Sequence, residues 1–224
     1  MDGFIIARMI SDYLFAFSTL ISIINPFAIG FVFLERTQGL SYRERAALAR
    51  RIAFYSLCVL LVAGFLGQQI LSFFGISLAA LRIAGGLTVA LAGWGMLNAP
   101  DAPDATSVAK VSMAAANRMA FFPMTMPLTT GPGTIAASIA LAANRSGDMR
   151  SLVPSMLVGL LVAATVSVVI YLAYRHAVSV ARMLGPDGSR LVTRVSAFLL
   201  LCVGVQITLT GVLDALTPLV MAGR

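Results

Sequence analysis

Residues 120–143 form a stretch of 24 residues that contains no charged side chain. About 20 apolar residues are enough for a helix to cross the hydrocarbon core of a bilayer. Inside this stretch, however, residues 123–133 read PMTMPLTTGPG and hold three prolines and two glycines. Because proline removes a backbone donor and clashes with the carbonyl four residues earlier, the sequence predicts a membrane-spanning segment whose helix is broken or kinked.

The composition of the whole chain agrees with a membrane location. Of its 224 residues, 59% are hydrophobic and 11% are charged, whereas a soluble domain has roughly 25% charged residues. The net charge of +7 does not indicate nucleic-acid binding, because the arginines gather in short segments between apolar runs, as they do in the cytoplasmic loops of membrane proteins. The predicted partner is therefore the lipid bilayer and not a nucleic acid.

Six apolar runs follow one another along the chain, and none alternates polar with apolar residues as the strands of a membrane barrel do. Helices satisfy their backbone hydrogen bonds internally, so we expect an all-α membrane protein with six transmembrane helices. The expected helices span approximately residues 13–35, 52–73, 75–97, 120–143, 152–174 and 194–213.

The basic residues are distributed unequally between the two sides of such a bundle. Segments 36–51, 98–119 and 175–193, with Arg194 at the edge of the last, hold eleven lysines and arginines, while the segments of the other side hold four. Loops rich in lysine and arginine stay in the cytoplasm. Both termini are therefore expected on the extracytoplasmic side.

The two halves of the chain show a weak internal sequence similarity. A shift of 101 residues aligns Pro26–Gly30 with Pro127–Gly131 and superposes the second apolar run on the fifth. Residues 1–97 and 120–224 would each hold three helices of opposite orientation, joined by a cytoplasmic linker at 98–119. This is the organisation of an inverted repeat, in which interrupted helices at matching positions mark the binding site of a transporter near the midplane.

The two breaks would expose backbone groups that can bind a polar ligand. Asn25 and Pro26 have the form of a helix restart, with asparagine as N-cap and proline at the first helical position, and Gly131–Pro132 would be a second restart. Helix N-termini carry a partial positive charge and bind anions. The candidate substrate-binding residues are Asn25, Pro26, Gly30, Pro127, Thr129, Thr130, Gly131, Gly133 and Thr134. The alternative is that the prolines only kink their helices.

Further polar residues lie at helical spacing beside the breaks. Ser18 and Ser22 share a helix face with Asn25, and Ser138 lies on the corresponding face of the fourth run. Together with Gln206 of the sixth run, the three serines are candidate cavity-lining residues. The alternative is hydrogen bonding between helices, the ordinary use of small polar residues in membranes.

Charged side chains are nearly absent from the runs themselves. Asp12, Glu35 and Asp214 lie at run edges, so a proton relay of buried carboxylates is not expected. Arg82 is the one charged residue well inside a run. We expect its long side chain to reach the outer surface, with a role in substrate binding as the alternative.

Residues with catalytic or metal-binding chemistry are sparse. Cys58 and Cys202 both lie in apolar runs, and His176 is the only histidine. No metal site and no nucleophile–base pair can be assembled from them. We therefore expect neither an enzyme nor a cofactor.

Three motifs resemble the MarC family of bacterial and archaeal membrane proteins. They are NPFAIGFVFLERT in the first run, RIAGGLTVALAG in the third and PLTTGPGTI in the fourth, and the resemblance spans the whole chain. The most specific of them, PLxxGPGxI, is intact at Pro127–Ile135. The first departs from the family pattern Asp/Asn-Pro-x-Gly-x-x-Pro-x-Phe, because Ala28 replaces the glycine and Phe31 the second proline. The first break is therefore expected to be milder.

The resemblance implies an inverted repeat similar to the LysE-type exporter superfamily, in a bacterial or archaeal plasma (inner) membrane. Some archaeal relatives are described as small neutral amino acid transporters. We therefore expect a secondary transporter that holds an amino acid such as glycine or alanine at the helix breaks. The alternatives are a passive channel for small solutes or ions and a structural membrane protein without transport. A coupling ion, Na⁺ or H⁺, and assembly into a homo-oligomer are both left open.

Overall fold

The computed structural model describes residues 2–37, 39–98, 117–143 and 149–222, and most of the expected linker 98–119 lies outside this description. The described chain is helical and holds no β-strand, which confirms the all-α fold class. In chain order the elements are α1 (Asp2–Ile24), α2 (Pro26–Arg36), α3 (Tyr42–Phe73), α4 (Leu78–Leu97), the widely wound η1 (Ala120–Thr129), α6 (Pro132–Ala143) and α7 (Met149–Ala222).

Among the described residues, five helical segments are long and apolar enough to cross a membrane. They are Ile6–Leu34, Tyr42–Phe73, Leu78–Leu97, Val153–Gly185 and Gly188–Thr217. Five of the expected runs are thus found as helices, most of them longer than expected. The remaining run, 120–143, is divided between η1 and α6, and α6 has only 12 residues. The pairing of the passes into an inverted repeat stays a prediction.

Local sequence signals set several helix ends. Ser41 begins α3 with a capping box, in which its hydroxyl oxygen accepts from the Glu44 backbone at 3.3 Å and the Glu44 carboxylate accepts from the Ser41 backbone at 2.8 Å. Ser77 caps α4 by accepting from the Ala80 backbone at 3.1 Å. At Gly185 a φ of 69° turns α7 back on itself, a conformation that glycine adopts without steric cost.

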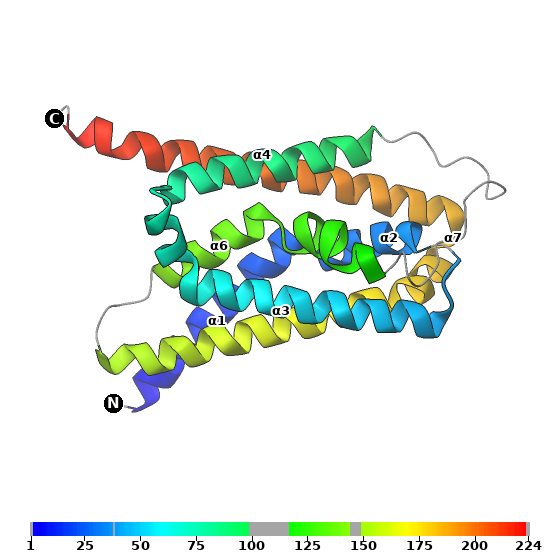
Figure 1. Ribbon diagram of the computed structural model, residues 1–224, viewed down its shortest axis with the longest axis horizontal. Coiled ribbons are helices and arrows are strands. Elements are labelled where there is room, and N and C mark those ends of the chain that lie inside the picture. Colours follow the sequence, from blue (N-terminus) through cyan, green and yellow to red (C-terminus); the bar gives the residue numbers. More distant parts are fainter. Residues whose placement is uncertain (1, 38, 99–116, 144–148, 223–224) are drawn as a thin grey trace.

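The helices form a bundle with long elements outside and short ones between them (Figure 1). In this view α4 runs beside the C-terminal half of α7, and α3 runs beside its N-terminal half. The short elements α2, η1 and α6 lie between these pairs, and α2 and α6 run toward opposite ends of the bundle. The two ends of the chain lie at the same end of the bundle, and the α2–α3 connection lies at the other.

Glycines bring α4 and the second half of α7 into close backbone contact. A Cβ added at Gly86 would lie 2.5 Å from the Thr208 nitrogen, and one added at Gly93 would lie 2.5 Å from the Leu201 nitrogen. On the facing helix, a Cβ at Gly204 would overlap the backbone of Ala90. Small residues at such contacts are typical of helix association in membranes, where backbones approach closely.

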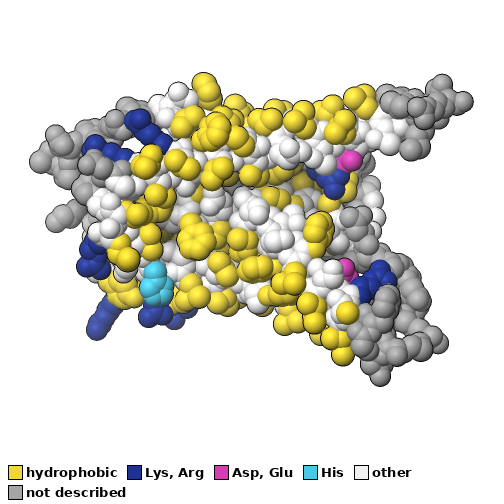
Figure 2. Space-filling model, turned by 180° about the vertical axis from the view of Figure 1, so that it is seen from behind, with side chains coloured by type: hydrophobic (Ala, Val, Ile, Leu, Met, Phe, Trp, Pro, Cys, Tyr) yellow, Lys and Arg dark blue, Asp and Glu magenta, His cyan; other side chains and the backbone are white. Residues whose placement is uncertain are grey.

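Large apolar side chains cover much of the outer surface. The space-filling view shows hydrophobic side chains over most of one face (Figure 2). Phe54, Leu91, Phe198 and Leu213 are each about half exposed or more. A soluble monomer rarely exposes so extensive an apolar surface, whereas lipid acyl chains cover it at no cost.

Candidate functional site

The first break separates α1 from α2 at a single residue. Asn25 adopts left-handed backbone angles of φ 44° and ψ 62°. Its side-chain oxygen accepts from the Ala28 backbone at 3.4 Å, and Pro26 is the first residue of α2. The restart expected from Asn25-Pro26 is therefore present as a true interruption of helical geometry, even though Ala28 and Phe31 depart from the family pattern.

The second break is longer and lies in η1. Phe122 and Met126 have extended angles, with φ near −120° and ψ near 123°, and each precedes a proline through a cis peptide bond. Thr130 leaves helical geometry at φ −116° and ψ 70°, and α6 then starts at Pro132. Residues 123–133 therefore break the helix rather than merely kink it.

Gly131 stands at the point where η1 turns into α6. A Cβ at this position would overlap the carbonyl oxygen of Pro127. The Gly131 carbonyl in turn accepts from the Ile135 backbone at 3.0 Å, the first turn of α6. Only glycine fits this close approach of the chain to itself.

Threonine hydroxyls donate to carbonyls five residues earlier within η1. Thr125 donates to the Ala120 carbonyl at 2.7 Å, and Thr129 donates to the Met124 carbonyl at 2.6 Å. Both threonines, and Thr130 beside them, are fully buried. These side chains thus serve the fold of the break itself, and neither Thr129 nor Thr130 lines either cavity described below.

A stack of side chains links α2, η1 and α7 beyond the second break. The Phe33 and Tyr174 rings stack with centroids 4.8 Å apart, and the Tyr174 hydroxyl lies 2.7 Å from the Thr129 hydroxyl. Phe33 and Tyr174 are almost completely buried. This cluster, Phe33–Tyr174–Thr129, packs α2, η1 and α7 against one another in the interior of the bundle.

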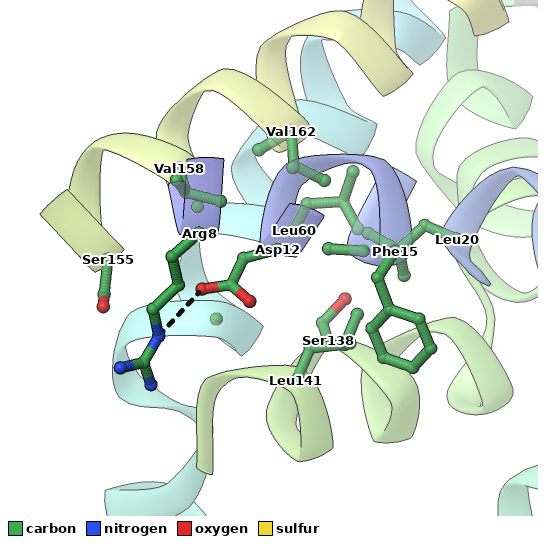
Figure 3. A pocket seen from close by; sticks show the side chains of 14 residues that line it. Arg8, Asp12, Phe15, Leu20, Leu60, Ser138, Leu141, Ser155, Val158 and Val162 are labelled. Atoms are coloured by element: carbon green, nitrogen blue, oxygen red, sulfur yellow. Dashed lines mark ion pairs between the residues drawn. The ribbon is translucent and has the colours of Figure 1, made fainter. Parts of the chain in front are cut away.

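On the opposite side a cavity of about 250 Å³ enters the bundle between α1, α3, α6 and α7. We call it the end pocket (Figure 3). Its walls are apolar and include Leu20, Leu60 and Val162. The close-up shows the Ser138 side chain of α6 directed into the pocket below Asp12.

The mouth of the end pocket carries one charge of each sign. Arg8 and Asp12 lie one turn apart on α1, with Nε and Oδ2 separated by 4.0 Å, and both are more than half exposed. Deeper in the pocket, the Ser138 hydroxyl donates to the Thr134 carbonyl at 2.8 Å, and its oxygen retains capacity to accept. The pocket therefore offers a cation, an anion and a hydroxyl to one small ligand.

The floor of the end pocket lies close to both breaks along the chain. Leu20 precedes Asn25 by five residues and Ser138 follows Pro132 by six. At 1.5 Å per residue these separations are about 8 and 9 Å. The end pocket thus ends roughly two helical turns or less from each restart.

A second cavity, of about 240 Å³, lies between α1, α4, α6 and the second half of α7. We call it the side groove. Phe15 and Leu141 line both cavities and so form a wall between them. Arg82 lies at the side groove and forms an ion pair with Asp214 of α7. The guanidinium of Arg82, which was expected to reach the outer surface, is paired with Asp214 four residues from the start of α4, and its reach to the surface stays a prediction.

The structure distributes the remaining candidate residues among three settings. Gly133 and Gln206 line the side groove, and Ser138 lines the end pocket. Packed within the breaks are Pro26, Gly30, Thr129, Thr130, Gly131 and Thr134, all buried, with Asn25 and Pro127 half-buried. Ser18 and Ser22 are exposed and line neither cavity.

Sequence reasoning did not single out Arg8 and Asp12 as site residues. The first helix was expected to begin near residue 13, which placed both of them outside it. Their spacing of four residues was the available signal, since residues i and i+4 share one helix face. Tyr174 was not predicted as a site residue either, because nothing in its local sequence indicates a contact with Thr129, 45 residues away.

Apolar helices long enough to span a bilayer, broken at two interior points, define a polytopic helical membrane protein. The model of the MarC family of integral membrane proteins matches residues 10–216, and the chain belongs to this family. It is 33% identical to inner membrane protein MarC of Escherichia coli over 201 residues, 87% of this chain and 91% of that protein. The protein of the same name from Citrobacter koseri is 34% identical over 202 residues, with the same coverage. No solved structure matches the chain.

Proposed function

We propose that this protein is a secondary transporter for small neutral amino acids of the size of glycine or alanine. The observation that carries the proposal is the end pocket, which is open at one end of the bundle and stops above two broken helices. Between this pocket and the opposite end lies the buried Phe33–Tyr174–Thr129 cluster, which we propose closes the second opening. A carrier that alternates between openings has this form in one of its states, whereas a channel has a continuous path.

The chemistry of the end pocket suits a zwitterion. Its carboxylate would bind Arg8 at the mouth and, further in, backbone amides at the restarts of α2 and α6. Its ammonium would bind Asp12 and then carbonyl oxygens near the breaks. The cavity of about 250 Å³ lies below the range of about 300–1,000 Å³ of sites for drug-sized ligands. The volume therefore suits a ligand smaller than a drug-sized molecule, and glycine and alanine fit within it.

Internal symmetry supports the same proposal. The helices α2 and α6 have 11 and 12 residues, each begins with proline directly after a break, and they run toward opposite ends of the bundle. We therefore propose that residues 1–97 and 120–224 form an inverted repeat joined by the linker 98–119. In such transporters, half-helix N-termini at the repeat interface bind the substrate.

We further propose that the protein lies in the inner membrane, as its named relatives do, with both termini outside the cytoplasm. On the face shown in Figure 2, basic side chains gather at one end of the molecule, and the acidic side chains in view lie beside basic ones at the other. Basic loops remain in the cytoplasm, so the end pocket would open to the outside.

Counterflow of labelled glycine and alanine in proteoliposomes tests the proposal. We expect unlabelled glycine inside the vesicles to accelerate uptake of labelled glycine, and Asp12→Asn to reduce that uptake. Arg190→Gln, at an exposed position five residues after the Gly185 turn of α7 and outside the end pocket, is the control for the loss of one charge. Uptake without acceleration would indicate a channel, and no uptake under any ion gradient would discard amino acid transport.

A further inference from the structure

The side groove combines an apolar interior with polar groups inside the membrane-spanning part of the molecule. Ile23, Ala137 and Ile207 provide apolar walls, and the side chains of Thr19 and Gln206 lie among them. The groove is separated from the end pocket by the Phe15–Leu141 wall described above. Because Phe15 is 64% exposed on a membrane-spanning helix, the groove borders the acyl chains of the bilayer.

An ion pair stands at this groove near the end of the membrane-spanning helices. Arg82 is four residues inside α4, which begins at Leu78, a depth of about 6 Å along the helix. Asp214 belongs to the span Gly188–Thr217. The Arg82 and Asp214 side chains are 21% and 41% exposed, so the pair is accessible from outside the protein. This depth corresponds to the boundary between headgroups and acyl chains.

The pair retains unused hydrogen-bonding capacity. A guanidinium has five N–H donors and a carboxylate has about four acceptor positions. The contact between them uses Nη1 of Arg82 and Oδ2 of Asp214. Within the described part of the chain, neither side chain makes another hydrogen bond or ion pair. Both groups can therefore bind a second dipole without breaking their own ion pair.

We propose that the side groove binds one phospholipid whose zwitterionic headgroup carries a primary ammonium, as in phosphatidylethanolamine. Its phosphate would accept from the free N–H groups of Arg82, and its ammonium would donate to Asp214. One acyl chain would fill the groove along Ile23 and Ile207. Because the ion pair is neutral as a whole, it complements a zwitterion better than an anionic headgroup.

Stepwise methylation of the headgroup tests the proposal on the unmodified protein. The purified full chain in detergent is titrated with phosphatidylethanolamine, its monomethyl and dimethyl forms and phosphatidylcholine, all with the same acyl chains. Native mass spectrometry measures the bound lipid. The charge stays constant along this series while the N–H donors fall from three to none. We expect one tightly retained phosphatidylethanolamine, and phosphatidylcholine bound about five- to tenfold more weakly, as for the loss of one hydrogen bond.

Substitutions locate the lipid. Asp214→Asn should remove the preference for phosphatidylethanolamine over phosphatidylcholine, and Arg82→Gln should weaken the binding of both. Arg190→Gln makes the same change of charge at an exposed position near the Gly185 turn of α7, outside the side groove, and should change neither. Equal retention of the two lipids by the unmodified protein overturns the proposal. A preference that persists unchanged in Asp214→Asn, with the variant monodisperse, does the same.

Discussion

At Gly131 the absence of a side chain is what allows η1 to turn into α6. The overlap of an added Cβ with the Pro127 carbonyl oxygen cannot be relieved by a rotamer change, because the backbone fixes the positions of both atoms. We expect Gly131→Ala to lower the free energy of unfolding by about 1–3 kcal/mol, the usual cost of overpacking. Thermal unfolding in detergent, followed by circular dichroism, measures the change.

Gly95 provides the matched control. It lies inside α4, and a Cβ added there meets no atom within 4 Å. Because alanine favours the helix over glycine by about 1 kcal/mol, Gly95→Ala should leave stability unchanged or raise it. Equal effects of the two substitutions would mean that the contact with Pro127 does not constrain the break.

The hydrogen bond between Tyr174 and Thr129 predicts an asymmetry between its partners. The single hydroxyl hydrogen of Thr129 goes to the Met124 carbonyl, so Tyr174 is the donor between the two. Tyr174→Phe removes the donor, keeps the ring against Phe33 and should cost about 0.5–1.5 kcal/mol. Thr129→Val leaves the Tyr174 hydroxyl buried without an acceptor and should cost more, about 1–3 kcal/mol.

Comparative unfolding of the two single variants and of the double variant measures this asymmetry. In the double variant no polar group is left unpaired at this contact, so its loss of stability should be smaller than the sum of the single losses. Additive losses would show that the two hydroxyls do not depend on each other in the folded protein.

At the scale of the element, the interruption between α1 and α2 depends on Asn25. Alanine there would lose the N-cap, which costs about 1 kcal/mol, and would hold a left-handed conformation, which costs roughly 1–2 kcal/mol. Asn25→Gly should cost only a few tenths of a kcal/mol, because glycine tolerates both. Chemical unfolding of the two variants compares them. A glycine variant as unstable as the alanine variant would assign to the Asn25 side chain a contact beyond capping.

The helix breaks were predictable because proline, glycine and asparagine act on their own backbone. Asn25-Pro26 and Gly131-Pro132 indicate restarts by local chemistry, and both are present. The wide winding of η1 was not predictable. It depends on extended backbone angles at Phe122 and Met126, and the same sequence is compatible with other backbone conformations there.

The sequence pattern also could not predict which side chains meet between helices. Arg82 meets Asp214 across 132 residues, and the rotation of each helix about its axis decides such pairs. A local spacing rule contains no information on that rotation. Each of the two cavities lies between four helices, so its lining also depends on how those helices are rotated. For this reason Ser18 and Ser22 were grouped with Ser138, although only Ser138 lines one of the cavities.

At the scale of the whole molecule, the two ends of the bundle differ in access. The end pocket reaches Ser138 from one end, and in the proposed carrier the buried cluster around Tyr174 closes the path to the other end. Val162 of the pocket and Tyr174 of the cluster lie on the same helix, 12 residues apart, or about 18 Å. In the proposed carrier these roles would be exchanged, and the separation is the distance along α7 that an amino acid would travel between the two regions.

Cysteine labelling measures this difference directly. Cys58 and Cys202 are both exposed and are first replaced by alanine. Ser138→Cys, in the end pocket, should then react with a membrane-impermeant maleimide added outside intact cells, and glycine should slow the reaction. Arg190→Cys, at the opposite end, should react only after permeabilisation. Reaction of Ser138→Cys from the inside alone would reverse the proposed orientation, and labelling that glycine leaves unchanged would separate the end pocket from the path of the amino acid.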